Sequence, residues 1–433
     1  MTYQNTLEFA KQLDASDPLR KYRERFYFPQ MNGREVVYFT GNSLGLQPKS
    51  TQDHVLKELE DWATFGVEGH FHARNPWFSY HELFSEVVSK IVGAKPTEVV
   101  VMNQLTINLH FLMASFYRPT KHRYKILCEY KAFPSDQYAL ETQAKFHGFS
   151  PNDAVIEAKP RDGEYAIRTE DILSTIEKNK NELALVLIGG VNYFTGQVFE
   201  MEKITAAAHK VGAMAGFDLA HAAGNIKLNL HDWNVDFACW CTYKYLNSGP
   251  GCVGGAYIHE RHHKAETPRL GGWWGHDKQS RFKMEKGFKP MMTAEAWQLS
   301  NAPVIAMACH KASVEIFVEA GMEALVEKSK KLTGYLEYII EEINSKLQIA
   351  SPKPQGNNLK LEIITPKDAR GCQLSIVAHG KGKSLYEKLA AGGVIADWRE
   401  PNVIRCAPVP LYNSFEDVWR FGEILAASLR TQA

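Results

Sequence analysis

The chain has 433 residues, of which 45% are hydrophobic and 23% are charged, and its 50 lysines and arginines nearly balance 49 acidic residues. This composition is typical of a folded globular protein and excludes a disordered chain. The net charge of +1 also excludes the basic surface by which proteins bind nucleic acid or acidic membranes.

No apolar run approaches the roughly 18 residues that a membrane span needs, and the N-terminus has neither an apolar signal core nor an arginine-rich leader. The seven cysteines are too few for a disulfide framework and are typical of a reducing compartment. We therefore expect a cytoplasmic enzyme.

The chain begins with a polar, helical pattern, from which we predict an N-terminal arm over residues 1–35. A short strand is expected at 36–39 and a helix at 48–62, with a proline near its first turn. From about residue 98, apolar runs alternate with helical patterns, which predicts βαβ units and a mostly parallel sheet. The strands are expected at 99–102, 124–128, 183–188, 213–217 and 235–241, and the helices at 106–117, 136–147, 169–178 and 201–211.

The alternation ends near residue 260, and a helical stretch follows at 303–346. A cluster of Pro, Gly and Asn predicts a loop at 351–358. The remaining segments are strands at 373–379, 394–398 and 403–406 and helices at 384–391 and 415–429. The fold class is therefore α/β, with a large domain at 36–310 and a smaller C-terminal α+β domain at 311–433.

Two short motifs resemble known sites but lack the structural context that those sites need. Residues 259–263, HERHH, fit the H-E-x-x-H pattern of zinc peptidases, which requires an amphipathic helix. The segment is nearly all charged, so we predict a solvated loop or helix start. Residues 249–254, GPGCVG, fit the dinucleotide pattern G-x-G-x-x-G, but a strand rather than a helix is expected to follow at 253–258.

A third motif, GNSLG at 41–45, fits the G-x-S-x-G turn that carries the nucleophile of serine hydrolases. That turn normally follows several strands of the central sheet, whereas only one strand is expected before Ser43. We favour a tight loop near a ligand, and a serine nucleophile at Ser43 is kept as an alternative.

Two polar side chains follow neighbouring strands near their carboxyl ends. Asp218 follows the run 213–217, and Lys244 follows the run 235–241. Ligands of open α/β sheets bind at this edge, and an enzyme that uses pyridoxal phosphate (PLP) needs a lysine for its Schiff base and an acid for the pyridine nitrogen. Residues 103–106 add a helix N-terminus and a Thr hydroxyl that could bind phosphate. These features favour a PLP site, although a capped helix and a structural Asp–Lys pair stay possible.

Longer segments are similar to the kynureninase family of fold-type-I PLP hydrolases, over about residues 36–425. The block around Lys244 separates this family from general aminotransferases. The matching segments are TGNSLGLQP (40–48), LTINLH (105–110), KAFPSDQYA (131–139), TGQVF (195–199), FDLAHAAGN (217–225), LHDWNVDFACWCTYKYLNSGPG (230–251), RFKME (281–285), LTGYLEY (332–338) and APVPLYNSFEDV (407–418). The resemblance implies a mostly parallel, seven-stranded type of sheet in the large domain and a homodimer with shared active sites.

The resemblance also implies roles for individual residues. Lys244 would hold PLP and act as the α-proton base, and Tyr243 would bind phosphate and act as an acid toward the β-carbon. Asp218 would pair with the pyridine nitrogen beside His221. Other cofactor contacts would come from Leu105, Thr106, Phe133 stacked on the ring, Pro134, Ser135, Asp136 and, across the dimer interface, Trp273 and Asn301. Substrate would be bound by Ser43, His70, Ser300, Asn301 and Arg405, the last holding its carboxylate.

The implied activity is the hydrolysis of L-kynurenine or 3-hydroxy-L-kynurenine to alanine and the matching anthranilate, in tryptophan degradation or NAD precursor synthesis. His70, Ser300 and Asn301 match residues around the substrate ring, which favours the 3-hydroxy substrate. One departure is Gly189, where relatives often carry Ser, so any side-chain contact there is absent.

Three alternatives stay open. A cysteine desulfurase-like PLP enzyme would need a mobile catalytic cysteine, for which Cys309 and Cys372 are poorly placed. A serine hydrolase would use Ser43. A non-catalytic dimer that keeps the fold is disfavoured because Lys244 and Arg405 are intact.

Overall fold

The computed structural model describes residues 2–350 and 360–430. The chain forms two compact units. Unit 1 contains Met1–Ser50, Phe194–Val198 and Ile316–Ala433, and unit 2 contains Thr51–Tyr193 and Phe199–Glu315. The loop expected at 351–358 lies outside the described residues, and the division into an arm and two domains stays a prediction.

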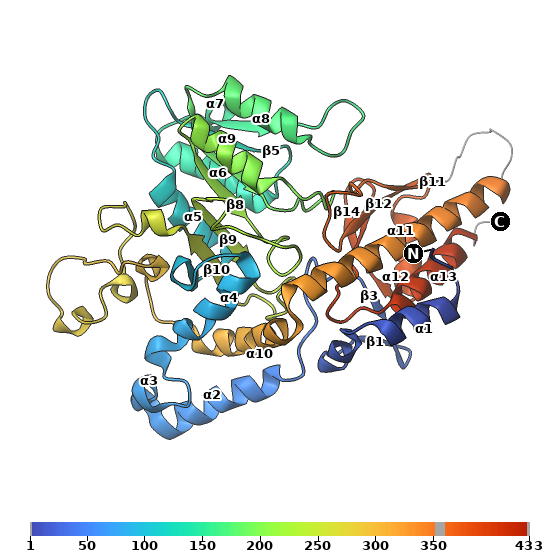
Figure 1. Ribbon diagram of the computed structural model, residues 1–433, viewed down its shortest axis with the longest axis horizontal. Coiled ribbons are helices and arrows are strands. Elements are labelled where there is room, and N and C mark those ends of the chain that lie inside the picture. The colour runs from blue at the N-terminus through green and yellow to red at the C-terminus, as the bar shows by residue number, and fades with distance from the viewer. Residues whose placement is uncertain (1, 351–359, 431–433) are drawn as a thin grey trace. The chain divides into compact units, whose positions relative to one another are not determined.

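Unit 2 is built on a seven-stranded, mostly parallel sheet, seen in Figure 1. Across the sheet, the strands are β4 (Val99–Val101), β10 (Gly254–Ile258), β9 (Phe237–Cys241), β8 (Met214–Asp218), β7 (Leu183–Gly189), β5 (Lys125–Glu129) and β6 (Val155–Ala158). Only β10 runs antiparallel to its neighbours β4 and β9. The central strands are continuously apolar because the sheet is covered on both faces. This confirms the predicted α/β class.

Helices precede and follow the strands of unit 2 and pack on its sheet and on one another. They are α2 (Thr51–Phe65), α3 (Gly69–His72), α4 (Ser85–Val92), α5 (Leu105–Phe116), α6 (Pro134–Phe146), α7 (Pro151–Ala154), α8 (Thr169–Lys178), α9 (Met201–Lys210) and the start of α10 (Val304–Ala320). The strand–helix alternation places the start of each following helix beside a strand's carboxyl end. Polar residues in those connections therefore gather at one edge of the sheet.

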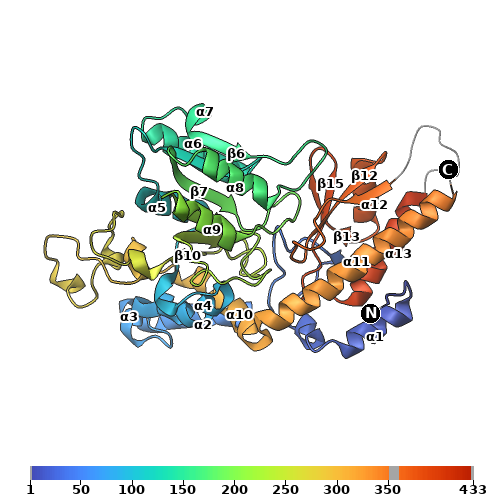
Figure 2. The ribbon, with the colours of Figure 1, turned by 45° about the horizontal axis from the view of Figure 1, so that its top comes forward.

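Unit 1 contains a four-stranded antiparallel sheet whose strand order is β11-β12-β15-β14. Figure 2 shows its long helix α11 beside α13. The elements are α1 (Leu7–Ser16), β1 (Gln30–Met31), β2 (Arg34–Glu35), β3 (Val37–Tyr38), α11 (Met322–Ala350), β11 (Lys360–Ile363), β12 (Leu374–His379), α12 (Lys383–Ala391), β13 (Val394–Ile395), β14 (Asp397–Arg399), β15 (Val403–Cys406) and α13 (Phe415–Arg430).

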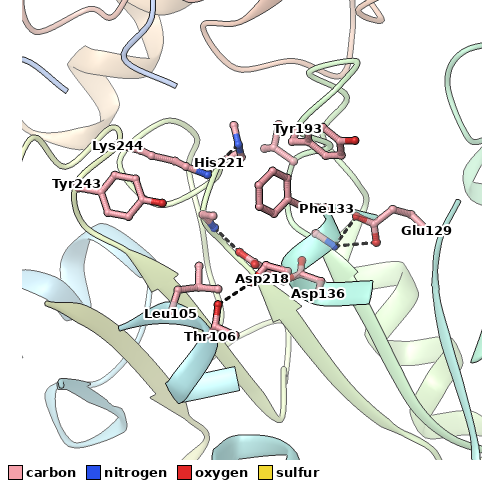
Figure 3. Close-up of a pocket in the computed structure, with 14 residues that line it drawn as sticks. Leu105, Thr106, Glu129, Phe133, Asp136, Tyr193, Asp218, His221, Tyr243 and Lys244 are labelled. Atoms are coloured by element: carbon pink, nitrogen blue, oxygen red, sulfur yellow. Dashed lines mark hydrogen bonds between the residues drawn. The ribbon is translucent and has the colours of Figure 1, made fainter. Parts of the chain in front are cut away.

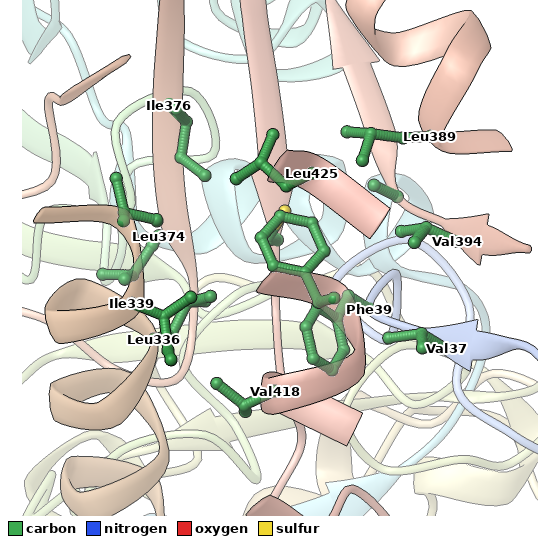
Figure 4. Packing of buried hydrophobic residues seen from close by; sticks show 14 of the residues in the cluster. Val37, Phe39, Leu336, Ile339, Leu374, Ile376, Leu389, Val394, Val418 and Leu425 are labelled. Carbon is green, nitrogen blue, oxygen red and sulfur yellow. The ribbon is translucent and has the colours of Figure 1, made fainter. Parts of the chain in front are cut away.

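The core of unit 1 joins segments that are hundreds of residues apart (Figure 4). Phe39, Leu336 and Val418 are each fully buried in one apolar cluster. Burying such side chains contributes about 1.5–3 kcal/mol each, so this cluster ties the N-terminal segment to α11 and α13. The Asp14 carboxylate adds a polar tie, because it accepts hydrogen bonds from the amides of Phe415 (2.8 Å) and Glu416 (2.9 Å) at the start of α13.

Some elements differ from the sequence-based expectation. Strands β6 and β11 were not expected. The predicted strand 394–398 is two strands, because β13 pairs with β3 whereas β14 pairs with β15. The predicted helix 303–346 is divided at Gly321, whose φ is +74°. Among the described residues, no helix combines the length and apolar character needed to span a membrane.

The H-E-x-x-H segment forms a short 3-10 helix at Glu260–His262, directly after β10. A helix start is therefore confirmed, but the expected solvation of the whole motif is wrong. His259 and His263 are 8% and 6% exposed. Their ring nitrogens contact different backbone groups, the amide of Arg261 and the carbonyl of Ile258, so this motif does not form the two-histidine site of a zinc peptidase.

Candidate active site

A pocket in unit 2 lies at the carboxyl edge of the parallel strands (Figure 3). Asp218 is the last residue of β8, and Lys244 lies three residues after the end of β9. The Lys244 Nζ atom is 3.1 Å from His221 Nε2 and 5.8 Å from the centre of the Phe133 ring.

Two helix N-termini contribute hydroxyl groups to this pocket. The turn between β4 and α5 uses Asn103 in a left-handed conformation, φ +50°, and the following residue, Gln104, does not cap the helix with its side chain. The Thr106 hydroxyl in the first turn of α5 lies 2.7 Å from the Ser135 hydroxyl in the first turn of α6. Uncapped first-turn amides and adjacent hydroxyls are the donors that bind phosphate.

Acidic groups dominate the electrostatics of the pocket floor. Burial raises the pKa of Asp218, an effect opposed by the hydrogen bond from the Ala220 amide (2.7 Å) and by the charge of Lys244. Burial and the negative charge of Asp218 raise the pKa of Asp136 well above its usual range. The hydrogen bond between the two carboxyl groups raises the pKa of Asp136 and lowers that of Asp218, so the negative charge is favoured on Asp218, where a protonated ring nitrogen would bind.

The structure brings most of the predicted cofactor residues together. The pocket is lined by Leu105, Thr106, Phe133, Ser135, Asp136, Asp218, His221, Tyr243 and Lys244 from the predicted set. Pro134 is the first residue of α6 and supports this wall from the helix start. Burial raises the pKa of the Tyr243 phenol, so Tyr243 keeps its proton at neutral pH.

Sequence reasoning missed Glu129, Val191, Tyr193 and Ala220, which also line the pocket. The Tyr193 ring packs edge-on against Phe133, with 5.2 Å between the ring centres. Glu129 is the last residue of β5. It could have been found by the strand-end rule that identified Asp218, which is that polar residues at the carboxyl ends of parallel strands line ligand sites. The other three lie in loops whose path no local pattern reveals.

Besides Pro134, four predicted residues of unit 2 do not line this pocket. Ser300 and Asn301 are exposed and line a second pocket near Asn103 and Gln104. Trp273 is 43% exposed. His70 lies in α3, where its Nδ1 atom is 2.9 Å from the Val67 carbonyl oxygen and its ring meets Trp77 edge-on.

The remaining predicted residues, Ser43 and Arg405, lie together in unit 1. Arg405 is 1% exposed and forms an ion pair with Asp397, its cross-strand neighbour on β14. The Ser43 hydroxyl donates to Asp397 and lies 3.1 Å from Arg405 Nη2. A serine nucleophile of the hydrolase type needs a histidine as its base. Among the described residues, the hydroxyl's partners are a carboxylate and a guanidinium instead, which disfavours a Ser43 hydrolase.

The residues of the pocket fit PLP. This cofactor requires a buried acid, a lysine and hydrogen-bond donors for its phosphate group. All three line one pocket within unit 2. The Asp136 Oδ1 atom is buried without a hydrogen-bond partner, so the site also offers a polar atom that a bound molecule could engage.

Fold and site define a PLP enzyme of the aminotransferase class-V family, whose family model matches residues 37–370. A structure of cysteine desulfurase from Thermococcus onnurineus shares this fold, with a TM-score of 0.71 and 18% identity over 96% of this chain and 97% of that one.

A second family model, kynureninase C-terminal domain, matches residues 325–425. The kynureninase of Flavobacterium psychrophilum is 59% identical, with 98% of each chain covered, and that of Flavobacterium johnsoniae is 58% identical at the same coverage. The chain belongs to the kynureninase family, and its cofactor is PLP. The likeness to cysteine desulfurase extends to the fold alone.

Proposed function

We propose that this protein catalyses the PLP-dependent hydrolysis of L-kynurenine or 3-hydroxy-L-kynurenine, which releases alanine and anthranilate or 3-hydroxyanthranilate. The observation that carries this proposal is the pocket in which Lys244 and Asp218 lie together, in a chain 59% identical to a kynureninase. Bound PLP supplies an electron sink for the carbon–carbon bond cleavage.

The side chains of the pocket have separate proposed roles. Lys244 holds the cofactor, and its Nζ atom accepts the α-proton, with His221 Nε2 3.1 Å away as a hydrogen-bond partner. Asp218 stays anionic and keeps the ring nitrogen protonated. The protonated phenol of Tyr243 is a donor for the β-carbon, which must gain a proton to become the methyl group of alanine. Water provides the oxygen that the anthranilate carboxylate gains.

We also propose that Arg405 binds the substrate carboxylate. Its guanidinium is buried and forms an ion pair with Asp397, and the planar fork of a guanidinium matches the geometry of a carboxylate. The contacts with Ser43 and Asp397 hold the guanidinium in a fixed orientation.

We propose a cytoplasmic homodimer in which Trp273 and Asn301 reach the active site of the partner subunit. The half-exposed Trp273 packs edge-on against Phe282, and Phe282 stacks on Phe78. Such an exposed aromatic cluster is typical of an interface, and it supports an assembly in which these side chains are covered.

The test is a direct assay of the purified protein with each kynurenine, in which alanine and the anthranilate are measured in equal amounts. We expect a yellow protein whose colour comes from bound PLP. A colourless protein would contradict the PLP assignment. Release of sulfur from cysteine without kynurenine cleavage would favour the cysteine desulfurase-like alternative. That alternative is disfavoured because all seven cysteines, each within the described residues, are buried or half-buried.

A further inference from the structure

The Glu129 carboxyl group holds the end of β7 beside Asp218. Its two oxygens accept hydrogen bonds from the Gly189 amide at 3.3 and 3.2 Å. Gly189 is the register partner of Asp218 in the sheet, and the next amide, Gly190, donates to the Asp218 carbonyl at 2.7 Å. The chain at 189–190 is therefore fixed on one side by Glu129 and on the other by Asp218.

Gly189 leaves room for this carboxyl group. A Cβ atom at position 189 would lie 3.0 Å from Glu129 Oε1, so any larger residue would press on the carboxyl oxygen. Glu129 is itself only 4% exposed and lines the cofactor pocket (Figure 3). A buried carboxyl in this position has little water to stabilise its charge.

The groups around Glu129 are mostly acidic. Glu157 on β6, Asp136 on α6 and Asp218 on β8 face it with negative or potentially negative charge, while Lys244 is the cation of the same pocket. Burial, together with the charges of Asp218 and Glu157, raises the pKa of Glu129 to about 7. The carboxyl is thus protonated in mildly acidic solution and ionised in mildly alkaline solution.

We propose that Glu129 is a positioning residue of the active site, which holds the β7 end against Asp218 through the Gly189 amide and sets the charge of the pocket by gaining or losing a proton. While Glu129 is protonated, the negative charge stays on Asp218. When Glu129 loses its proton, a second negative charge lies beside the cofactor and favours the protonated forms of the cofactor's nitrogen atoms. As it concerns catalysis, this inference rests on the proposed function, but its test observes the carboxyl group and the cofactor directly.

The first measurement follows the proton. Holoenzyme labelled with ¹³C in its glutamate carboxyl groups is titrated by NMR between pH 5.5 and 9. We expect one glutamate signal with a midpoint near pH 7 that is absent from Glu129→Gln. It should be retained, with a lower midpoint, in the matched control Glu157→Gln, which removes a carboxyl from the neighbouring strand outside the pocket and with it a charge that raises the pKa of Glu129. The absence of any such signal from wild type would overturn the proposal, whether or not the variants fold.

The second measurement follows the visible absorbance of bound PLP in the same samples. Removing one negative charge from the pocket lining weakens the stabilisation of a nearby protonated nitrogen and so lowers the titration midpoint of that nitrogen. We expect the cofactor's midpoint to fall by about 0.5–1 unit in Glu129→Gln and to stay unchanged in Glu157→Gln. Equal midpoints in wild type and both variants would overturn the charge-switching role.

Kynurenine cleavage measured on the same preparations separates the two proposals. A wild type that shows the Glu129 titration but cleaves no kynurenine would contradict the proposed function alone. A wild type that cleaves kynurenine without a titrating Glu129 would contradict this inference alone. Glu129→Asp, whose shorter side chain cannot reach Gly189 equally well, should keep a titrating acid yet bind PLP more weakly, because the β7 end loses its tie.

Discussion

The Nζ atom of Lys244 lies 3.1 Å from Nε2 of His221, and both side chains line the pocket that contains Asp218. A lysine beside an imidazole can pass on a proton without moving far, and the nearby carboxylate balances the charge that results. The three residues come from two successive strand ends, so the sheet itself fixes their spacing.

Lys244→Ala should abolish turnover, because no other group of the pocket can both hold the cofactor covalently and accept the α-proton. We expect steady-state kynurenine cleavage to fall at least about 100-fold, the lower bound for losing a general base. The exposed Lys210→Ala on α9 is the matched control and should keep full activity. Substantial turnover by the Lys244 variant would refute the assignment.

Asp218→Asn should weaken PLP retention, because the ring nitrogen loses its charged partner while the side chain keeps its size. A hydrogen bond to a charged group contributes about 1.5–3 kcal/mol, so the dissociation constant measured by equilibrium dialysis should rise roughly 10- to 150-fold. The exposed Asp232→Asn serves as control. Normal affinity and rate in Asp218→Asn would mean that another residue holds the nitrogen.

Arg405→Lys should raise KM strongly and leave PLP binding intact, because a lysine cannot form the two parallel hydrogen bonds of a guanidinium with a carboxylate. Arg399→Lys is a stringent control, since Arg399 also contacts Asp397 at 3.1 Å. Steady-state kinetics and PLP absorbance provide the two readouts. Unchanged kinetics in Arg405→Lys would mean that another residue binds the substrate carboxylate.

Much of the large sheet could be predicted because its strands are buried on both faces and read as continuous apolar runs, as in Leu183–Gly189. The strand-end rule then brought Asp218 and Lys244 together without any alignment. The pairing of β13 with β3 could not be predicted, because two-residue strands carry no periodic signal and their partners are more than 350 residues apart.

The same limit applies to the site. Glu129 obeys the strand-end rule, yet a glutamate after an apolar run looks like an ordinary surface residue until the sheet shows that it is buried. The Ser43–Arg405 contact depends on chain segments that meet only in the folded unit. Local sequence patterns therefore did not exclude Ser43 as a nucleophile. Family resemblance, rather than spacing, supplied the roles of Trp273 and Asn301, and those roles stay predictions.

The shared-site proposal predicts that two inactive subunits can complement each other. Trp273 does not line the pocket that holds Lys244, and the proposal is that it contacts the active site of the other subunit. Mixing Lys244→Ala with Trp273→Ala subunits should restore activity, because one of the two sites in each heterodimer would be intact. Differently tagged subunits show that heterodimers form. Heterodimers without restored activity would contradict the shared site.

The substrate preference follows from the polar groups proposed to surround the substrate ring. His70 and Asn301 can both hydrogen-bond a ring hydroxyl. A site built around that hydroxyl leaves polar groups unpaired when the hydroxyl is missing, at a cost of about 1–3 kcal/mol, or roughly 5- to 150-fold in selectivity. We therefore predict a higher kcat/KM for 3-hydroxykynurenine than for kynurenine.

The measurement is kcat/KM for both substrates in wild type and in the double variant His70→Trp, Asn301→Thr. The double variant should lose most of the preference, because the imidazole and the amide are replaced by side chains of different shape and hydrogen-bonding geometry, while Lys244 and Asp218 are untouched. The control is His72→Ala, a neighbouring exposed histidine of α3, which should leave the ratio unchanged. A wild type that favours kynurenine, or a double variant with an unaltered ratio, would show that these residues do not read the ring hydroxyl and that His70 serves only the contacts it makes with Val67 and Trp77.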